Sequence, residues 1–353
     1  MTSPSLSCAR TICAAALLGV ASIGLAADRP AAPGASKNAF VLWTFAEHYA
    51  PRAAQFVAAS ATFRRNLEDL CATPANITAD KLDAARAGWT STMLAWETVG
   101  AITFGPLFYR RSTYRIDAWP VRRIGLDGAI SRKAASLEEL APIAANLKGL
   151  PAIEALLWPF PPRNDPLRTL GDEPDRCAYA ALLARDIEGE AKDIETAVAR
   201  LVTEGEPADP AAASFAKLLN QTLGAIEQLA ERKMYTDDTG PTGRGRDFPR
   251  AVSRNTLAAW NAQWLSIQHL LVGGAGAAGG IEGYLRANGH VAAATRLRAE
   301  VDRATVTLRE TTAATPATAR VVTRDLAGVR AALTEDVAAA LKTTIRFSET
   351  DGD

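Results

Sequence analysis

The chain has 353 residues, with 39 Lys plus Arg against 39 Asp plus Glu and 48% hydrophobic residues. Because the formal net charge is zero, no general field draws the chain to nucleic acid or to an anionic membrane surface, and we expect neither as a partner. The length leaves room for one large domain or two medium ones.

Residues 1–26 are predicted to be a signal peptide. Arg10 supplies the basic start, residues 12–25 form an apolar stretch too short to span a bilayer, and small residues around Ala26 are typical of a cleavage site. We therefore expect a soluble product exported to the periplasm, with no membrane span after cleavage.

Cleavage would leave two cysteines, Cys71 and Cys177. Two cysteines in an oxidising compartment favour a disulfide between them. Two separate buried thiols are the alternative.

We predict an all-α fold, because Ala, Leu, Arg and Glu dominate and runs of β-branched residues are few. The clearest helix is 79–100, where Trp89, Met93 and Trp96 recur on one face at spacings of three and four. Similar periods mark 38–70, 176–203, 211–233, 255–272, 290–311 and 318–342.

Two breaks divide the helical pattern. Residues 159–174 are rich in proline and read as a surface loop, whereas 205–210 separate two helical blocks. We expect an N-terminal bundle half at 36–204 and a C-terminal bundle half at 205–345.

Residues 104–123 form the densest polar cluster, a short, loop-like stretch with five Arg, two Tyr and no Lys. Arginine makes bidentate contacts with carboxylates and phosphates that lysine cannot make. The segment is therefore either an anion site or part of a buried Arg–Asp network that ties the loop to the helices.

A short helix is predicted from Ala152 to Trp158. Pro151 suits the first position of a helix, and Pro159 ends it. Glu154 then lies in the first turn, where the helix dipole favours a carboxylate. This favourable interaction with the helix dipole is one explanation for a glutamate at position 154, and a role in ligand binding is the other.

Metal ligands are scarce. His48, His269 and His290 have no His or Cys partner three or four residues away, and no H-E-x-x-H occurs. Zinc is therefore not expected, and each histidine reads as a core or surface residue, with a haem axial ligand at His269 as the alternative.

A glycine-rich motif follows the predicted helix 255–272. Gly274, Gly276 and Gly279 match G-x-G-x-x-G but follow an apolar helix instead of a strand, so they predict a helix–helix connection and not a dinucleotide site.

Three elements of the sequence resemble the imelysin-like family. The family motif G-x-H-x-x-E is matched by Gly149 and Glu154, but Pro151 stands in the His position. An R-x-D-x-W-P element is matched by Arg115, Asp117, Trp119 and Pro120. A helix start at 253–257 and a Gly-rich turn after Val272 resemble the second half of the family.

The resemblance implies an all-helical fold of two bundle-like halves, export, and a link to iron or haem acquisition. The family also carries a peptidase label and a His–Glu metal pair. Because proline has no side-chain donor atom, we expect no catalytic residue and no resident metal here. The leading hypothesis is a non-catalytic binding component of iron or haem uptake. The alternatives are a metallopeptidase that uses Glu154 with other ligands, and a helical adaptor that docks another envelope protein.

The candidate ligand-binding residues are Arg115, Asp117, Trp119, Glu154, Tyr109, Tyr114, Ser253 and Asn255. We expect them to meet where the Arg-rich segment approaches the Glu154 helix. Carboxylate and phenolate oxygens suit ferric iron, the indole would form a wall, and the serine and asparagine would donate hydrogen bonds from the second half. Arg115 would hold an anionic group or fix Asp117, and a purely structural Arg115–Asp117 ion pair is the alternative.

Overall fold

The computed structural model describes residues 36–73, 77–159, 165–204, 211–234, 248–274 and 279–344. The predicted signal peptide and Gly276 lie outside these residues. The regular structure in the described ranges is helical throughout and includes no strand, so the predicted all-α fold is confirmed. None of the described helices is both long and apolar enough to cross a membrane.

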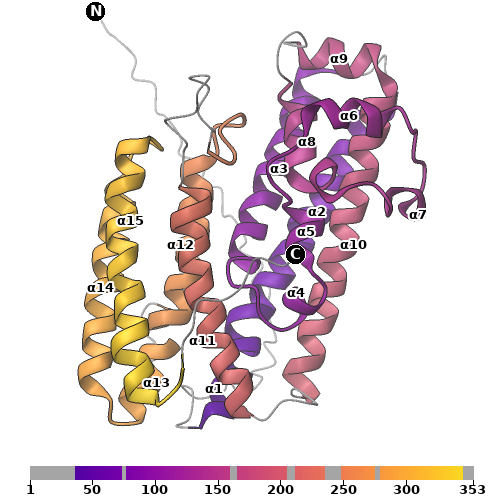
Figure 1. Cartoon of the computed structure of the whole chain (residues 1–353). Helices are drawn as coiled ribbons and strands as arrows, with labels where there is room; N and C mark the ends of the chain where they lie inside the picture. The colour runs from indigo at the N-terminus through magenta and orange to yellow at the C-terminus, as the bar shows by residue number, and fades with distance from the viewer. Residues whose placement is uncertain are drawn as a thin grey trace, which may run out of the picture. The chain divides into compact units, whose positions relative to one another are not determined.

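Long helices form the core of the N-terminal half. The chain runs through α1 (Lys37–Trp43), a π-helical turn η1 (Thr44–Tyr49), α2 (Ala50–Leu70), α3 (Ala79–Val99) and α10 (Pro174–Glu204). Figure 1 shows α2 between α3 and α10, and α2 packs against both. The predicted helices 38–70, 79–100 and 176–203 are therefore confirmed, although the periodicity did not predict the π-helical turn.

Short helices connect α3 to α10. They are α4 (Pro106–Tyr109), α5 (Ser112–Ile116), α6 (Arg123–Ile130), α7 (Leu137–Leu140), the 3-10 turn η3 (Ala145–Leu147), α8 (Gly149–Leu157) and α9 (Pro166–Asp172). The Arg-rich segment, expected to be loop-like, thus contains helical turns that bury Leu107 and Ile116. Helix α8 begins at Gly149, three residues before the predicted start at Ala152. Pro151 is tolerated there because the N–H groups of the first turn have no partner within a helix.

The C-terminal half is a second set of packed helices. It comprises α11 (Ala211–Glu227), the π-helical turn η4 (Gln228–Lys233), α12 (Thr256–Val272), α13 (Gly280–Ala287), α14 (Val291–Glu310), α15 (Pro316–Ala331), the π-helical turn η5 (Ala332–Val337) and α16 (Ala338–Leu341). Helix α14 packs against α12, α13 and α15. Gly274 and Gly279 lie between α12 and α13, as a helix connection requires.

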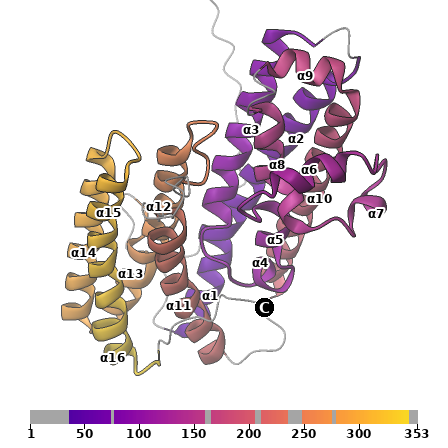
Figure 2. The ribbon, with the colours of Figure 1, turned by 45° about the horizontal axis from the view of Figure 1, so that its top comes forward.

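The two sets of helices share an apolar interior. Helix α12 packs against α3, and α1 packs against α11, as both views of the ribbon show (Figure 1 and Figure 2). At the second contact the ring centroid of Phe40 lies 5.5 Å from that of Phe215, and it also lies 5.4 Å from that of Tyr284 in α13. Two bundle-like halves are therefore present, while the proposed boundary at 204/205 stays a prediction.

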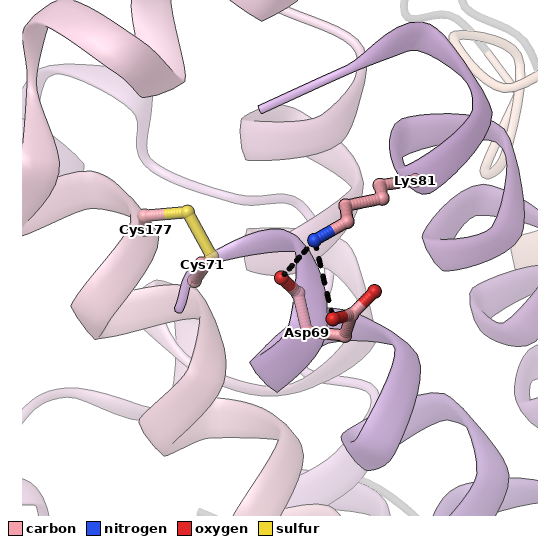
Figure 3. The surroundings of a disulfide bond; sticks show 4 residues. All are labelled: Asp69, Cys71, Lys81 and Cys177. Carbon is pink, nitrogen blue, oxygen red and sulfur yellow. Dashed lines mark hydrogen bonds and ion pairs between the residues drawn. A yellow bond between two sulfur atoms is a disulfide. The ribbon is translucent and has the colours of Figure 1, made fainter. Parts of the chain in front are cut away.

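The predicted disulfide joins the end of α2 to the start of α10 (Figure 3). Cys71 and Cys177 are bonded, with their Cα atoms 5.4 Å apart. Beside the bond, Lys81 donates to the side chain of Asp69 at 3.2 Å, which links α3 to α2. The bond encloses α3 to α9 within one covalent loop.

Candidate functional site

The end of α5 lies directly against the start of α8. Gly149 has a φ of 70°, and a Cβ atom added there would overlap the backbone carbonyl of Ile116. Only glycine meets both requirements, a left-handed backbone and a close approach of two chains. This contact brings Asp117, the residue after α5, close to the Gly149 turn.

Four charged side chains form a buried group that we call the ion-pair cluster: Glu97, Asp117, Lys233 and Arg250. Lys233 Nζ lies 2.8 Å from Asp117 Oδ2 and 3.1 Å from Glu97 Oε1. Arg250 Nη2 lies 2.5 Å from Asp117 Oδ1 and 3.4 Å from Glu97 Oε1. The cluster therefore ties α3 and the α5 end to η4 and to the segment that precedes α12.

The charges of the cluster hold one another in their ionised forms. Burial would raise the pKa of Asp117, but Arg250 and Lys233 outweigh it and hold that pKa below its usual value. Burial would lower the pKa of Lys233, but Asp117 and Glu97 outweigh it and raise that pKa. Since each cation faces both carboxylates, the carboxylates are neutralised and fit a free metal ion poorly.

Arg250 is held in place by its backbone and by an aromatic ring. Its φ is 67°, a left-handed conformation, and its carbonyl accepts a hydrogen bond from the Asn255 N–H at 3.0 Å. The guanidinium lies 5.7 Å from the centroid of the Trp89 ring. Its Nε and Nη1 make no hydrogen bond within the described residues.

Glu154 is bound by Ser253, close to the ion-pair cluster. Its Oε1 accepts hydrogen bonds from the Ser253 N–H at 3.1 Å and from Ser253 Oγ at 2.6 Å. The carboxylate is 5% exposed and helps to raise the pKa of Arg250. The side chain therefore fastens α8 to the segment before α12, and with Pro151 in the His position this arrangement does not fit the His–Glu metal pair of the resemblance.

A cavity of about 700 Å³ opens beside the ion-pair cluster. Its floor includes Trp96, Glu97, Asp117, Lys233 and Gln263, and its mouth includes the exposed rings of Phe108, Tyr109 and Tyr114. Elements of both halves contribute to the lining, because Trp96 comes from α3, whereas Gln263 comes from α12 and Lys233 from η4. The volume is in the range of pockets that bind organic ligands.

Four of the eight predicted ligand-binding residues line this cavity: Tyr109, Tyr114, Asp117 and Trp119. Ser253 contacts Glu154 instead, and Asn255 donates to Thr90 Oγ1 at 3.4 Å. Of the three residues expected to face a common cavity, Arg115, Asp117 and Glu154, only Asp117 lines this one. The structure thus places Asp117 with the two tyrosines and Trp119 at this cavity, and ligand contact by the predicted residues stays a prediction.

Arg115 has different partners from the expected ones. Its Nη2 lies 2.8 Å from Asp186 Oδ1, and its Nη1 pairs with Glu190, both on α10. Glu190 is fully buried and also binds Arg110 at 2.8 Å and Ser112 Oγ at 2.7 Å. The expected Arg115–Asp117 pair is replaced by a network to α10, because the short helix α5 presents the arginine to that helix.

Three members of the ion-pair cluster were not predicted from the sequence: Glu97, Lys233 and Arg250. Glu97 follows Trp96 in the clearest of the predicted helices, and a carboxylate beside that apolar face was a signal of a buried partner. Lys233 ends a π-helical turn, a feature that often marks functional sites but that periodicity does not reveal.

A second buried polar pair joins η1 to α12. His48 Nδ1 lies 3.3 Å from His269 Nδ1, and His48 Nε2 lies 3.4 Å from Ser266 Oγ. Ser266 donates its own proton to the Thr98 carbonyl at 2.6 Å. Because burial lowers the pKa of both imidazoles and keeps both rings neutral near pH 7, His48 Nε2–H donates to Ser266 and His269 Nδ1–H donates to His48 Nδ1.

This pair predicts a loss of stability at acidic pH. Burial, with Arg52 nearby, lowers the pKa of His48 well below its usual value and that of His269 to about 4. The stabilisation is complete above the unfolded pKa of about 6.5 and is lost as the pH falls toward the folded values, by up to about 1.4 kcal/mol per pH unit for each proton, and by less for the partly exposed His269. Urea unfolding at pH 7.5, 6.0 and 5.0 should show this decline. The double variant His48→Gln, His269→Gln should have a flatter profile, and equal slopes would contradict the assignment.

Comparison with known proteins decides the family. The model of the Imelysin family (peptidase M75) matches residues 49–345. The chain belongs to the imelysin family. A curated relative, iron-regulated protein A of Synechococcus elongatus, is 27% identical over 198 residues, which is 53% of this chain and 51% of the relative. The match thus spans about half of that protein's length.

Two solved structures share the imelysin fold with this chain. An imelysin-like protein from Psychrobacter arcticum 273-4 has a TM-score of 0.71 at 18% identity and covers 88% of this chain and 97% of its own. A candidate iron-regulated protein A precursor from Parabacteroides distasonis has a TM-score of 0.69 at 14% identity and covers 90% of this chain and 97% of its own. At these identities the comparison shows the fold alone.

Proposed function

We propose that this chain is a periplasmic member of the imelysin family that binds an iron-related ligand and does not hydrolyse peptides. The observation that carries the proposal is the cavity, which has an aromatic mouth and a floor that includes Glu97, Asp117 and Lys233 of the ion-pair cluster. The name of the curated relative, iron-regulated protein A, supports the link to iron.

The binding role is supported by how the polar residues are used. Tyr109, Tyr114 and Trp119 line the cavity and can contact a ligand there. The other four predicted residues have a structural role in the proposal, because their contacts join the elements that surround the cavity. They are Arg115, Glu154, Ser253 and Asn255.

The absence of hydrolysis is supported by the carboxylates. Glu97 and Asp117 are paired with Lys233 and Arg250, and Glu154 accepts from Ser253, so none is placed as a free general base. Among the described residues, no group of three or more His, Cys, Asp or Glu side chains is arranged to hold a metal. A catalytic zinc normally needs three protein ligands.

Ligand titration tests the proposal. Hemin and ferric chelates are added to the purified protein, and tryptophan fluorescence reports binding because Trp96 and Trp119 line the cavity. The double variant Tyr109→Ala, Tyr114→Ala should weaken binding by roughly tenfold or more through loss of ring contacts, about 1.4 kcal/mol. Leu265→Ala, which removes an exposed side chain of α12 outside the cavity lining, is the control.

Two results would overturn the proposal. Zinc-dependent peptide cleavage that disappears in Glu154→Gln would favour the metallopeptidase. No binding of hemin or of any ferric chelate would favour the helical adaptor.

A further inference from the structure

The inner wall of the cavity holds a buried amide that lacks a hydrogen-bond donor. Gln263 is 2% exposed, and its Oε1 has no hydrogen-bond partner in the described part of the chain. A buried acceptor without a donor is unfavourable, and such groups in native proteins are normally satisfied. Because Gln263 lines the cavity, an N–H or O–H group of a ligand is the donor that this position fits.

The walls around this amide are aromatic. Trp96, Phe108, Tyr109, Tyr114 and Trp119 all line the cavity. Such a set offers flat apolar faces, which pack well against the faces or edges of other rings. The cavity is therefore suited to a ligand that contains aromatic rings.

The charges of the lining favour an anion. Arg111, Arg232 and Lys233 line the cavity against Glu97 and Asp117, three positive residues against two negative ones. Both carboxylates are paired within the ion-pair cluster, and the side chains of Arg111 and Arg232 are exposed. Arg111 also lies 5.2 Å from the ring centroid of Tyr114, which places a guanidinium beside an aromatic face.

We propose that the cavity binds an anionic aromatic chelate of ferric iron, one in which catecholate or phenolate oxygens fill the coordination sphere of the metal. The proposal rests on the proposed function and specifies its ligand class. Ferric iron takes hard oxygen donors, and a chelator that supplies them all needs none from the protein. The rings meet the aromatic walls, the negative charge meets the arginines, and an amide N–H of the chelator donates to Gln263.

Three ferric complexes distinguish the ligand class. The ferric complex of 2,3-dihydroxybenzoylglycine is aromatic, anionic and carries an amide N–H, ferric citrate is anionic without rings, and hemin is aromatic with its iron bound by nitrogens. Equilibrium dialysis at fixed ionic strength measures each affinity. We expect the catecholate complex to bind at least about tenfold more tightly than ferric citrate, a difference of about 1.4 kcal/mol.

The variant Gln263→Leu separates binding from folding. Leucine removes the unpaired acceptor, so the melting temperature should stay the same or rise, while affinity for the catecholate complex should fall by roughly tenfold. Gln268→Leu, a half-buried position of the same helix outside the lining, should change neither. The double variant Arg111→Gln, Arg232→Gln should weaken the same complex and reduce the salt dependence of its binding.

The outcomes are distinct. Binding of ferric citrate or hemin without binding of the catecholate complex would overturn this inference and leave the proposed function standing. Binding of none of the three would overturn both. Unchanged affinity in Gln263→Leu would overturn the role assigned to the amide.

Discussion

Replacing Asp117 with Asn is expected to lower the free energy of unfolding by about 3–5 kcal/mol, because it removes one member of a buried ion pair and leaves the others uncompensated. Asp117 contacts both cations of the ion-pair cluster, at 2.8 Å from Lys233 and 2.5 Å from Arg250. Without it, Glu97 alone would face two buried positive charges. Guanidinium unfolding at pH 7, followed by circular dichroism, measures the change.

An exposed carboxylate provides the matched control. Asp193 also pairs with an arginine, Arg110, but its side chain is 57% exposed. Asp193→Asn should cost less than about 1 kcal/mol, since surface ion pairs contribute little. If the two variants unfold at the same denaturant concentration, Asp117 is not the stabilising link between the halves that the geometry indicates.

The pH range in which the ion-pair cluster stabilises the fold follows from the direction in which each pKa is shifted. The pKa of Asp117 is lowered in the folded chain, so its contribution is present above its unfolded value of about 3.9 and is lost below it. The pKa of Lys233 is raised, so its contribution is present below about 10.4 and is lost above the folded value. The cluster should therefore remain effective across the range from pH 7.5 to 5.0 that the histidine experiment covers.

The helices could be predicted because their signal is local. The spacing of Trp89, Met93 and Trp96 predicted α3, and the same periodicity predicted the ends of the other long helical segments to within two residues. The R-x-D-x-W-P and Gly149 elements located two chain segments that do meet, since Gly149 lies against Ile116.

The partners of the charged residues could not be predicted in the same way. Asp117 meets Lys233 and Arg250, which are 116 and 133 residues away in the sequence. Arg115, only two residues before Asp117, turns to α10 because the short helix α5 sets the direction of each side chain. The spacing of residues along the chain reports only local structure, so it does not indicate which charged residues pair across such long separations.

The unpaired amide oxygen of Gln263 could not be predicted from the sequence. Gln263 follows an ordinary helical pattern in α12, and only the packing of α12 against α3 buries it beside the cavity. The feature that marks Gln263 is the missing hydrogen-bond donor to its Oε1 atom, and only the packed structure reveals that the donor is missing.

Removal of the disulfide is expected to have the second large effect. Cys71 and Cys177 are 106 residues apart in sequence, and a loop of this length corresponds to a loss of about 4–5 kcal/mol of stability in the chain-entropy model, an upper figure. The enclosed segment, α3 to α9, contains Glu97, Asp117 and Glu154 together with most of the aromatic wall of the cavity. The double variant Cys71→Ala, Cys177→Ala should therefore unfold at a clearly lower denaturant concentration than the oxidised protein.

The neighbouring ion pair gives the comparison that isolates the covalent bond. Lys81 and Asp69 join α3 to α2 beside the disulfide, but their side chains are 30% and 65% exposed, so Lys81→Met should cost at most about 1 kcal/mol (Figure 3). Intact-mass measurement after alkylation without reductant should show no free thiol in protein that lacks residues 1–26, and two labelled thiols after reduction. Two free thiols before reduction, or a double variant as stable as the oxidised chain, would mean that ion pairs and packing alone hold the start of α10 to α2.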